Sequence, residues 1–154
     1  ALAEALAPLA DCRGLAAAAG TSATPAVRAV ATLGGNIAAS GFAASDLVPA
    51  LLVAEADVEV AGPDGTRRHT LERFLVMRQD LAPGSLIARV IVPRRGWKSA
   101  HARLPLRVAG DYPVAIVSIA VRLDGDDSVA AARIAVGSPE PAARRRGALE
   151  AALA

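Results

Sequence analysis

The chain has 154 residues, of which 53% are hydrophobic and 3% aromatic, and it carries a formal net charge of +2. This length suits one domain of ordinary size or two small ones, and the apolar share is enough for a buried core. The tight arginine clusters at 94–95 and 144–146 have no aromatic residues interleaved with them, which argues against a nucleic-acid surface.

The cysteine count excludes a disulfide and several kinds of metal site. The single cysteine, Cys12, excludes an internal disulfide, a four-thiolate iron–sulfur cluster and a structural zinc site. No apolar run reaches the roughly 18 residues of a membrane-spanning helix, and the first ten residues lack the basic start of a secretory signal. We therefore expect a cytoplasmic chain without a transmembrane segment. Because no Met stands at residue 1, we also expect it to begin inside a larger protein.

Residues 1–95 predict helices mixed with antiparallel strands. Leucines at helical spacing indicate a first helix over 1–10, limited by Pro8, and an alanine-rich second helix ends at Gly20. Residues 21–31 are expected to be a connector, which either places Arg28 near the following loop or presents it on a short helical turn. Further along, the pattern predicts a helix over 47–56, a hairpin of strands 57–61 and 66–70, a helix over 71–77, and a buried strand over 86–92.

The remainder of the chain is strand-like. Residues 94–97 resemble a linker, and Pro105 indicates an edge position for the strand that contains it. The expected elements are strands over 100–108, 114–123 and 129–136, and a terminal helix over 142–153 with Leu149 and Leu153 on one face.

The glycine pair Gly34–Gly35 is the candidate binding loop. Without Cβ atoms the backbone can adopt positive φ and lets a ligand reach main-chain N–H groups. A helical turn beginning at Asn36 would direct those groups and the helix dipole at a phosphate or pyrophosphate, and Thr32 and Ser40 could add neutral hydrogen bonds. The pattern is neither G-x-G-x-x-G nor a P-loop. Turn chemistry favours the alternative that the pair is only a turn or a helix-capping device.

Two polar residues precede the predicted helix over 47–56. Ser45 or Asp46 is suited to be its N-cap. Asp46 could instead accept a hydrogen bond from a ribose hydroxyl or a ring N–H of a ligand, although the capping role is favoured from the sequence.

Several motifs occur in the order found in one known family. They are PAVR at 25–28, ATLGGNI at 31–37, DLVPALL at 46–52, GTRR at 65–68, AGDYP at 109–113 and IAVGS at 134–138. In these motifs the chain resembles the flavoprotein subunit or domain of the molybdenum hydroxylases. These are of the xanthine dehydrogenase and carbon monoxide dehydrogenase medium-subunit type, with a PCMH-type FAD-binding fold.

The resemblance assigns residues around the glycine pair to the FAD pyrophosphate. It implies phosphate contacts for Thr32, Gly34, Gly35 and Asn36 in the T-x-G-G-N segment. A hydroxyl-bearing residue slightly further on also reaches the phosphates in this family, which here implies Ser40.

Further residues are assigned by the same resemblance. Ser45 and Asp46 correspond to a pair near the adenosine half of FAD. Leu86 and Ile87 correspond to apolar residues that pack against the cofactor, and Arg103 lies where some members place a lysine beside the flavin ring. No catalytic or metal-binding residue is implied.

The fold class implied is α+β. Residues 1–95 resemble the second FAD-binding subdomain, and residues 98–154 resemble the small C-terminal domain, a three-stranded antiparallel sheet plus a helix. The family's first FAD subdomain carries a further glycine-rich loop of the A-G-G-T-D type, and nothing in residues 1–30 matches it. Half of the cofactor cradle is therefore expected to lie outside this chain.

The function implied is that of an electron-transfer flavoprotein subunit of an oxidoreductase. Electrons would pass from a molybdenum-cofactor subunit through the clusters of an iron–sulfur subunit to FAD and on to an acceptor. The alternative is a truncated, non-catalytic remnant that serves as an assembly or interaction module without FAD. An apolar surface left open by the absent subdomain would also allow a homodimer.

Overall fold

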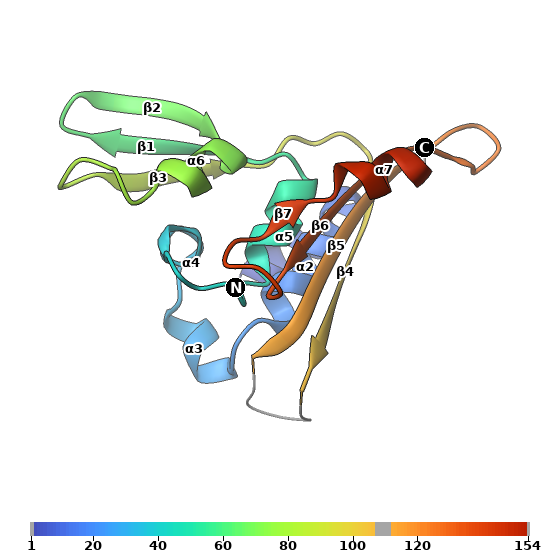
Figure 1. Ribbon diagram of the computed structural model, residues 1–154, viewed down its shortest axis with the longest axis horizontal. Coiled ribbons are helices and arrows are strands. Elements are labelled where there is room, and N and C mark those ends of the chain that lie inside the picture. The colour runs from blue at the N-terminus through green and yellow to red at the C-terminus, as the bar shows by residue number, and fades with distance from the viewer. Residues whose placement is uncertain (1, 107–111, 154) are drawn as a thin grey trace.

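The computed structural model describes residues 2–106 and 112–153, which form two antiparallel sheets and several short helices (Figure 1). The elements that begin before residue 60 are α1 (Leu2–Leu6), a 3-10 turn (Ala10–Cys12), α2 (Arg13–Thr21), α3 (Pro25–Val30), α4 (Leu33–Ala38), α5 (Leu47–Val53) and β1 (Asp57–Gly62). They are followed by β2 (Gly65–Thr70), α6 (Leu71–Met77), β3 (Leu86–Ile91), β4 (Lys98–Pro105), β5 (Pro113–Leu123), β6 (Val129–Gly137), β7 (Arg144–Arg145) and α7 (Gly147–Leu153). The predicted α+β class is confirmed.

The first sheet has the strand order β2-β1-β3. Its β1–β2 hairpin was predicted from alternation and turn residues, and Val58 and Val60 of β1 are buried as that alternation requires. The prediction of a buried strand over 86–92 is wrong in its burial. β3 is an edge strand, and the side chain of Leu86 is 59% exposed. A β-branched run fits an edge strand as well as a central one, so composition could not separate the two.

The second sheet has the order β4-β5-β6-β7, and Pro105 lies on the edge strand β4 as expected. Its fourth strand is the short β7, which replaces the first part of the helix predicted over 142–153. Helix α7 begins only at Gly147, and both Leu149 and Leu153, predicted to share one face, are exposed. The last residues of the predicted strand 100–108 and AGD of the AGDYP motif lie outside the described residues.

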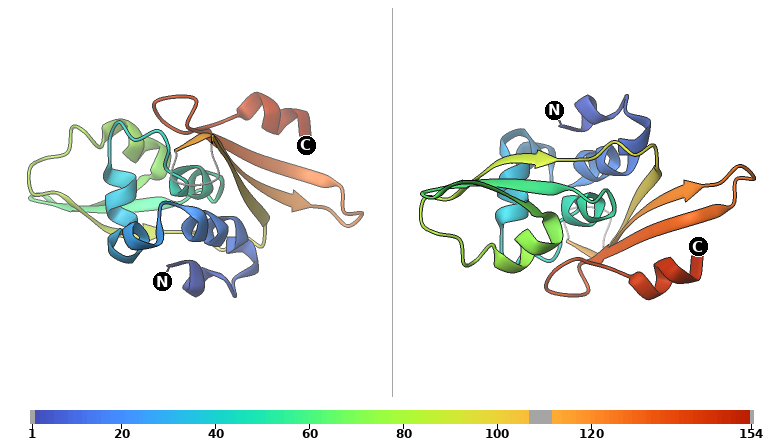
Figure 2. Two further views of the ribbon diagram at one scale, coloured as in Figure 1. Left: turned by 90° about the horizontal axis from the view of Figure 1, so that it is seen from below. Right: turned by 90° about the horizontal axis from the view of Figure 1, so that it is seen from above.

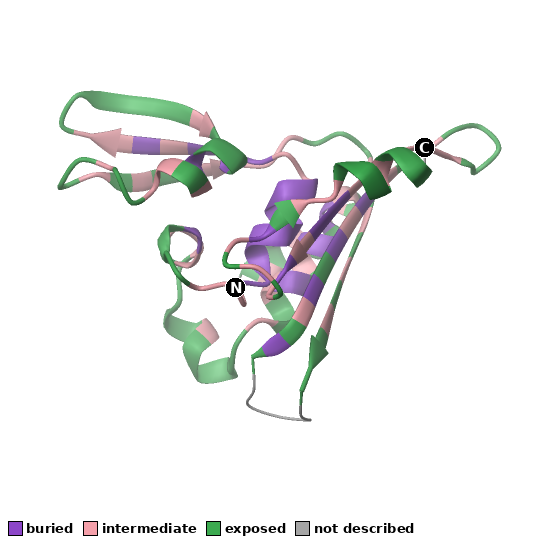
Figure 3. Cartoon of the chain, viewed as in Figure 1, coloured by how far each residue is buried: buried purple, intermediate pink, exposed green. Residues whose placement is uncertain are grey.

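Helix α5 lies between the two sheets and is the centre of the core (Figures 1 and 2). All seven of its residues are buried, as the purple ribbon in Figure 3 shows. A helix that is apolar on every side is stable only when it is enclosed, and each buried Leu or Val contributes roughly 1.5–3 kcal/mol. The core around α5 includes residues from both predicted domains. Leu15 and Phe74 come from residues 1–95, and Ala135 comes from residues 98–154. The boundary itself stays a prediction.

Helix α2 packs on β4 on one side of the second sheet, while α7 lies on the other side (Figure 2). Gly14 makes the α2 contact close, because a Cβ there would stand 3.0 Å from backbone atoms of Ala100. Residues 25–30, expected to be part of a connector, form helix α3, with the side chain of Thr24 capping Val27 N. No helix in residues 2–106 and 112–153 is both long enough and apolar enough to cross a bilayer.

Candidate functional site

Helix α4 begins three residues earlier than predicted, at Leu33 instead of Asn36. Both glycines are therefore helical, and neither has the positive φ that the sequence allowed. Thr32 is the N-cap, and its hydroxyl oxygen accepts a hydrogen bond from Gly35 N at 3.0 Å. A Cβ on Gly35 would stand 3.0 Å from that same oxygen, so a side chain at 35 would crowd the cap. Gly35 thus takes part in a helix cap, as one interpretation of the pair predicted, and the left-handed backbone is not needed.

The first turn of α4 keeps donors for a ligand. Within residues 2–106 and 112–153, no protein acceptor meets the amides of Leu33 and Gly34, whereas Asn36 N bonds to Thr32 O at 3.0 Å. The Thr32 hydroxyl also retains its own hydrogen, because it uses only an oxygen lone pair in the cap. These donors point out of a helix N-terminus, where the helix dipole favours an anion.

Asn36 is held by the loop that follows α4. Ser45 Oγ donates to Asn36 Oδ1 at 2.6 Å and accepts from Val48 N at 3.3 Å. Ser45 thus caps α5, whereas Asp46 makes no capping hydrogen bond, so the favoured capping role of Asp46 is wrong. With Oδ1 of Asn36 occupied by Ser45, its side-chain amino group remains available as a donor.

The carboxylate of Asp46 turns instead toward β4. Its Oδ1 lies 3.3 Å from His101 Nε2 and its Oδ2 lies 3.6 Å from Arg103 Nη1. His101 Nδ1 lies 2.9 Å from Ser118 Oγ on the neighbouring strand β5. His101 and Ser118 were not predicted from the sequence. The available signal was that His101 and Arg103 stand two residues apart on one strand, which places them on the same face as each other.

A groove of about 930 Å³ opens beside these residues. Its walls come from α2, α3, the N-terminus of α4 and the loop before α5, together with Arg103 and Tyr112. Of the predicted site residues, five line it: Thr32, Asn36, Ser45, Asp46 and Arg103. The other five, which are Gly34, Gly35, Ser40, Leu86 and Ile87, are not among the lining residues. The volume lies within the range of about 300–1,000 Å³ typical of small-molecule sites.

The residues outside the groove have other surroundings. Gly34 faces β3, since a Cβ on it would stand 3.6 Å from Ile87 Cβ, so Ile87 supports α4 from behind. Ser40 is exposed in the turn after α4, and Leu86 is exposed on the edge strand. Their assignment to the cofactor stays a prediction.

Arg28 and Arg103 supply positive charge at the groove. Arg28 lies on the short helix α3, which was one of the two sequence alternatives, and it still reaches the groove. Its Nη1 donates to Ser22 O at 2.7 Å and to Ala23 O at 2.6 Å, so it folds back on the loop before α3. Both guanidiniums are therefore anchored to backbone carbonyls or to Asp46 and do not move freely in solvent.

The loop that forms one groove wall is supported from below by the end of β6. Ser138 N donates to Ala43 O at 3.1 Å, and Ser138 has φ of 77°. A Cβ on Gly137 would stand 3.0 Å from Pro49 Cγ, so only glycine lets the strand pass this close. The IAVGS motif therefore has a structural role, which is to hold residues 42–46 in place.

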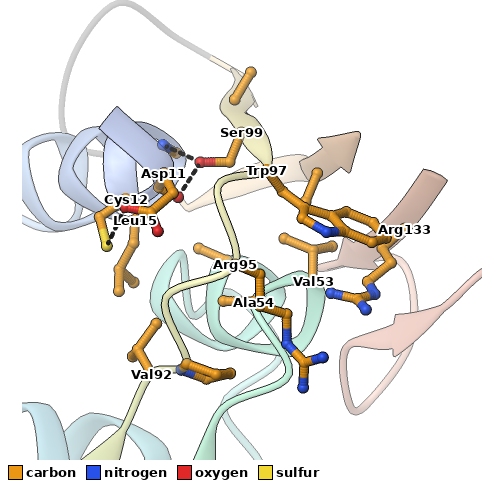
Figure 4. Close-up of a pocket in the computed structure, with 15 residues that line it drawn as sticks. Asp11, Cys12, Leu15, Val53, Ala54, Val92, Arg95, Trp97, Ser99 and Arg133 are labelled. Carbon is orange, nitrogen blue, oxygen red and sulfur yellow. Dashed lines mark hydrogen bonds between the residues drawn. The ribbon is translucent and has the colours of Figure 1, made fainter. Parts of the chain in front are cut away.

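A second, much smaller cavity lies at the N-terminal end of α2, whose C-terminal end borders the groove (Figure 4). It measures about 30 Å³, enough for about one water molecule. Trp97 and Arg133 border it, with the Arg133 guanidinium 3.8 Å from the Trp97 ring centroid. Burial and, secondly, the charge of Asp11 raise the pKa of the Cys12 thiol at its edge. This cavity is too small for an organic ligand.

The described residues contain no group of three or more His, Cys, Asp or Glu side chains placed to hold a metal ion. The groove instead suits an elongated anionic ligand. It joins the free backbone amide of Leu33, the Thr32 hydroxyl and the Asn36 amide to two anchored guanidiniums and the aromatic pair Phe42–Tyr112, whose rings meet edge to face at 5.5 Å. A nucleotide diphosphate with a planar ring fits this donor set.

The comparisons with known proteins agree with this chemistry. The family model described as the FAD binding domain in molybdopterin dehydrogenase matches residues 2–95. Among solved structures, carbon monoxide dehydrogenase from Hydrogenophaga pseudoflava, in a form lacking the Mo-pyranopterin moiety of the molybdenum cofactor, is 30% identical. That match covers 99% of this chain and 53% of the other, with a TM-score of 0.86.

Two further structures are similar. Quinoline 2-oxidoreductase from Pseudomonas putida 86 is 28% identical over 80% of this chain and 43% of the other, with a TM-score of 0.69. Carbon monoxide dehydrogenase from Oligotropha carboxidovorans shares the fold at 22% identity, over 98% of this chain and 55% of the other, with a TM-score of 0.75. The chain thus spans about half the length of the structures it matches.

Proposed function

Since the chain belongs to the family of the FAD binding domain in molybdopterin dehydrogenase, we propose that the groove beside α4 receives the pyrophosphate of FAD. One arrangement carries this proposal. The amides of Leu33 and Gly34 lack a protein acceptor within the described residues, and Leu33 lines the groove beside Thr32 and Asn36. Such a cluster of neutral donors at a helix N-terminus binds a diphosphate without any lysine.

Several side chains at the groove would hold the cofactor. Thr32 donates its hydroxyl hydrogen and Asn36 its side-chain amide hydrogens to phosphate oxygens, while Arg28 and Arg103 neutralise charge from the walls. FAD, when bound, supplies the redox chemistry, and no side chain of this chain need act as acid, base or nucleophile. Ser45 keeps the Asn36 amide turned toward the groove through its 2.6 Å hydrogen bond.

The finer role proposed is that of the electron-transfer flavoprotein part of a molybdenum hydroxylase. In this role the chain works in the cytoplasm beside a molybdenum-cofactor subunit and an iron–sulfur subunit, and FAD passes electrons from the clusters to an acceptor. The enclosure of the ligand is shared with residues beyond this chain, because the match covers only 53% of the carbon monoxide dehydrogenase chain. Cofactor sites normally bury about 70–90% of a ligand, so the groove alone is an incomplete one.

A second candidate function is an assembly module that binds no FAD. It is favoured by exposed apolar side chains on several elements, of which Val30 on α3 is 81% and Val76 on α6 74% exposed. Large exposed apolar side chains can form contact surfaces between proteins. This candidate predicts association of the chain without any dependence on flavin.

FAD titration followed by fluorescence quenching separates the two functions. For a half-enclosed site we expect a dissociation constant between about 1 µM and 1 mM. Asn36→Ala should weaken binding by about 1–3 kcal/mol, because it removes a donor to a charged ligand. Ser45→Ala should weaken binding by a smaller amount, because it removes the hydrogen bond that orients Asn36 but leaves the donor amide of Asn36 in place. No quenching at millimolar FAD, or equal losses in the two variants, would contradict the pyrophosphate site.

A further inference from the structure

A chain of three buried polar side chains runs from the groove into the second sheet. The side chains of His101 and Asp46 are 1% and 3% exposed, and Ser118 is fully buried. His101 and Ser118 stand directly opposite each other in the β4–β5 register. The hydrogen-bond distances are 2.9 Å from Ser118 Oγ to His101 Nδ1 and 3.3 Å from His101 Nε2 to Asp46 Oδ1.

With a neutral imidazole, the donors and acceptors in this network allow one arrangement of protons. A carboxylate offers only acceptors, so Nε2 of His101 must carry the hydrogen that faces Asp46. In a neutral imidazole Nδ1 is then an acceptor, and the Ser118 hydroxyl donates to it. Every polar atom that faces the next residue is satisfied, which buried polar groups require. The imidazole is therefore held in a single tautomer and orientation.

The residue types are those of a serine-hydrolase triad, but the two ring nitrogens are exchanged, because Ser118 meets Nδ1 and Asp46 meets Nε2. That function does not follow, because Ser118 lies inside a strand with no exposed surface and its hydroxyl cannot meet a substrate. The end of this hydrogen-bonded network that reaches the groove is Asp46. The network therefore acts on the groove and has no reactive serine of its own.

At the groove the network ends on Arg103. Asp46 Oδ2 lies 3.6 Å from Arg103 Nη1, and the same nitrogen donates to Thr21 O. Arg103 Nε is buried and has no hydrogen-bond partner among the described residues. One side of the guanidinium is thus fixed by protein atoms while its Nε donor is left without a partner, and Arg103 as a whole borders the groove.

We infer that His101 is a positioning residue which, through Asp46, sets the guanidinium of Arg103 at the groove wall for an anionic ligand. The identity of that ligand as FAD rests on the proposed function. The orientation of Arg103 does not, because it is built from residues of this chain alone. His101 fixes one oxygen of Asp46, and the other oxygen is thereby directed at Arg103.

The first test reads the guanidinium directly in the ligand-free 154-residue chain by NMR. We expect the Nε2–H tautomer for His101 and slow hydrogen exchange at Arg103 Nε. His101→Leu should accelerate that exchange by about tenfold or more, since the network that orders Arg103 is lost. His101→Gln keeps one donor and one acceptor and should restore part of the protection. Ser118→Ala serves as a second variant if the leucine variant does not fold.

His69 offers a matched control, because it is the chain's other histidine, lies on β2 and does not line the groove. His69→Gln should leave Arg103 exchange unchanged. The positioning role is overturned if His101 carries its hydrogen on Nδ1, or if Arg103 exchange is the same in wild type, His101→Leu and Ser118→Ala.

The second test uses FAD as the probe. His101→Leu should weaken FAD binding by about fivefold or more and reduce its salt dependence, since an ordered cation is lost from the groove. If wild type binds no FAD but Arg103 exchange depends on His101, the positioning role is supported and the proposed function fails. If FAD binds equally well to wild type and His101→Leu while Arg103 exchange is unaffected, the proposed function is supported and the positioning role is overturned.

Discussion

Replacing Thr32 by alanine separates its two roles, as the cap of α4 and as a donor to the ligand. The chain offers a matched control in Thr70, which caps α6 with Oγ1 accepting from Arg73 N at 3.3 Å, against 3.0 Å for Thr32 and Gly35. Losing either cap should lower the free energy of unfolding by about 1 kcal/mol. Thr70 does not line the groove, so its loss should leave ligand binding unchanged.

Thr32→Ala should in addition weaken FAD binding. A hydrogen bond from a hydroxyl to a charged phosphate contributes about 1.5–3 kcal/mol, which corresponds to about a 10- to 150-fold rise in the dissociation constant. Urea unfolding without ligand gives the cap contribution, and FAD titration gives the affinity. Thr32→Ser retains both the acceptor and the donor and should bind nearly as wild type. The reasoning is refuted if Thr32→Ala and Thr70→Ala have equal affinities for FAD.

Three further predictions concern the packing and charges around α2. Gly14→Ala should destabilise the chain by about 1–3 kcal/mol in thermal unfolding, because its Cβ would stand 3.0 Å from the β4 backbone. Gly20→Ala in the same helix is the control and should be neutral or slightly stabilising, because its Cβ would stand 3.8 Å from the nearest atom. The Arg94 guanidinium, 2.6 Å away, lowers the pKa of Asp11, so the stability it contributes is present above the unfolded pKa and lost as pH falls through the lower folded value. Asp11→Asn should therefore flatten the loss of stability below about pH 4 in urea titrations, and an unchanged acid limb would contradict the pairing. Burial raises the pKa of Cys12, so iodoacetamide should label the folded chain far more slowly than the urea-unfolded one, and equal rates would show that the thiol is open.

Local patterns in the sequence predicted the parts of the fold that depend on near neighbours. The β1–β2 hairpin and the strand β5 follow from alternation and from turn residues, and these were correct. The exposure of β3 depends on which strands neighbour it, and the exposure of Leu149 depends on where α7 lies, so the local sequence pattern could predict neither. The short helix α3 did have a local signal, since Thr24 precedes Pro25 at the first helical position, and that signal was overlooked.

Some residues of the candidate site could likewise be predicted from the sequence, and others could not. Thr32 and Asn36 could be named from the sequence because they flank the glycine pair. The partner of Asp46 could not, because His101 is 55 residues further along the chain and reaches it only when β4 packs beside the start of α5. The capping role assigned to Asp46 was wrong because the hydroxyl of Ser45, one residue earlier, accepts the hydrogen bond from Val48 N in α5.

Amide chemical shifts recorded with and without FAD test the central claim most directly. If the N-terminus of α4 receives the diphosphate, the backbone amides of Leu33 and Gly34 should show the largest changes, together with the side-chain amide of Asn36. The account is contradicted if FAD leaves these three signals in place, or if the shifts gather at the small cavity beside Trp97 instead.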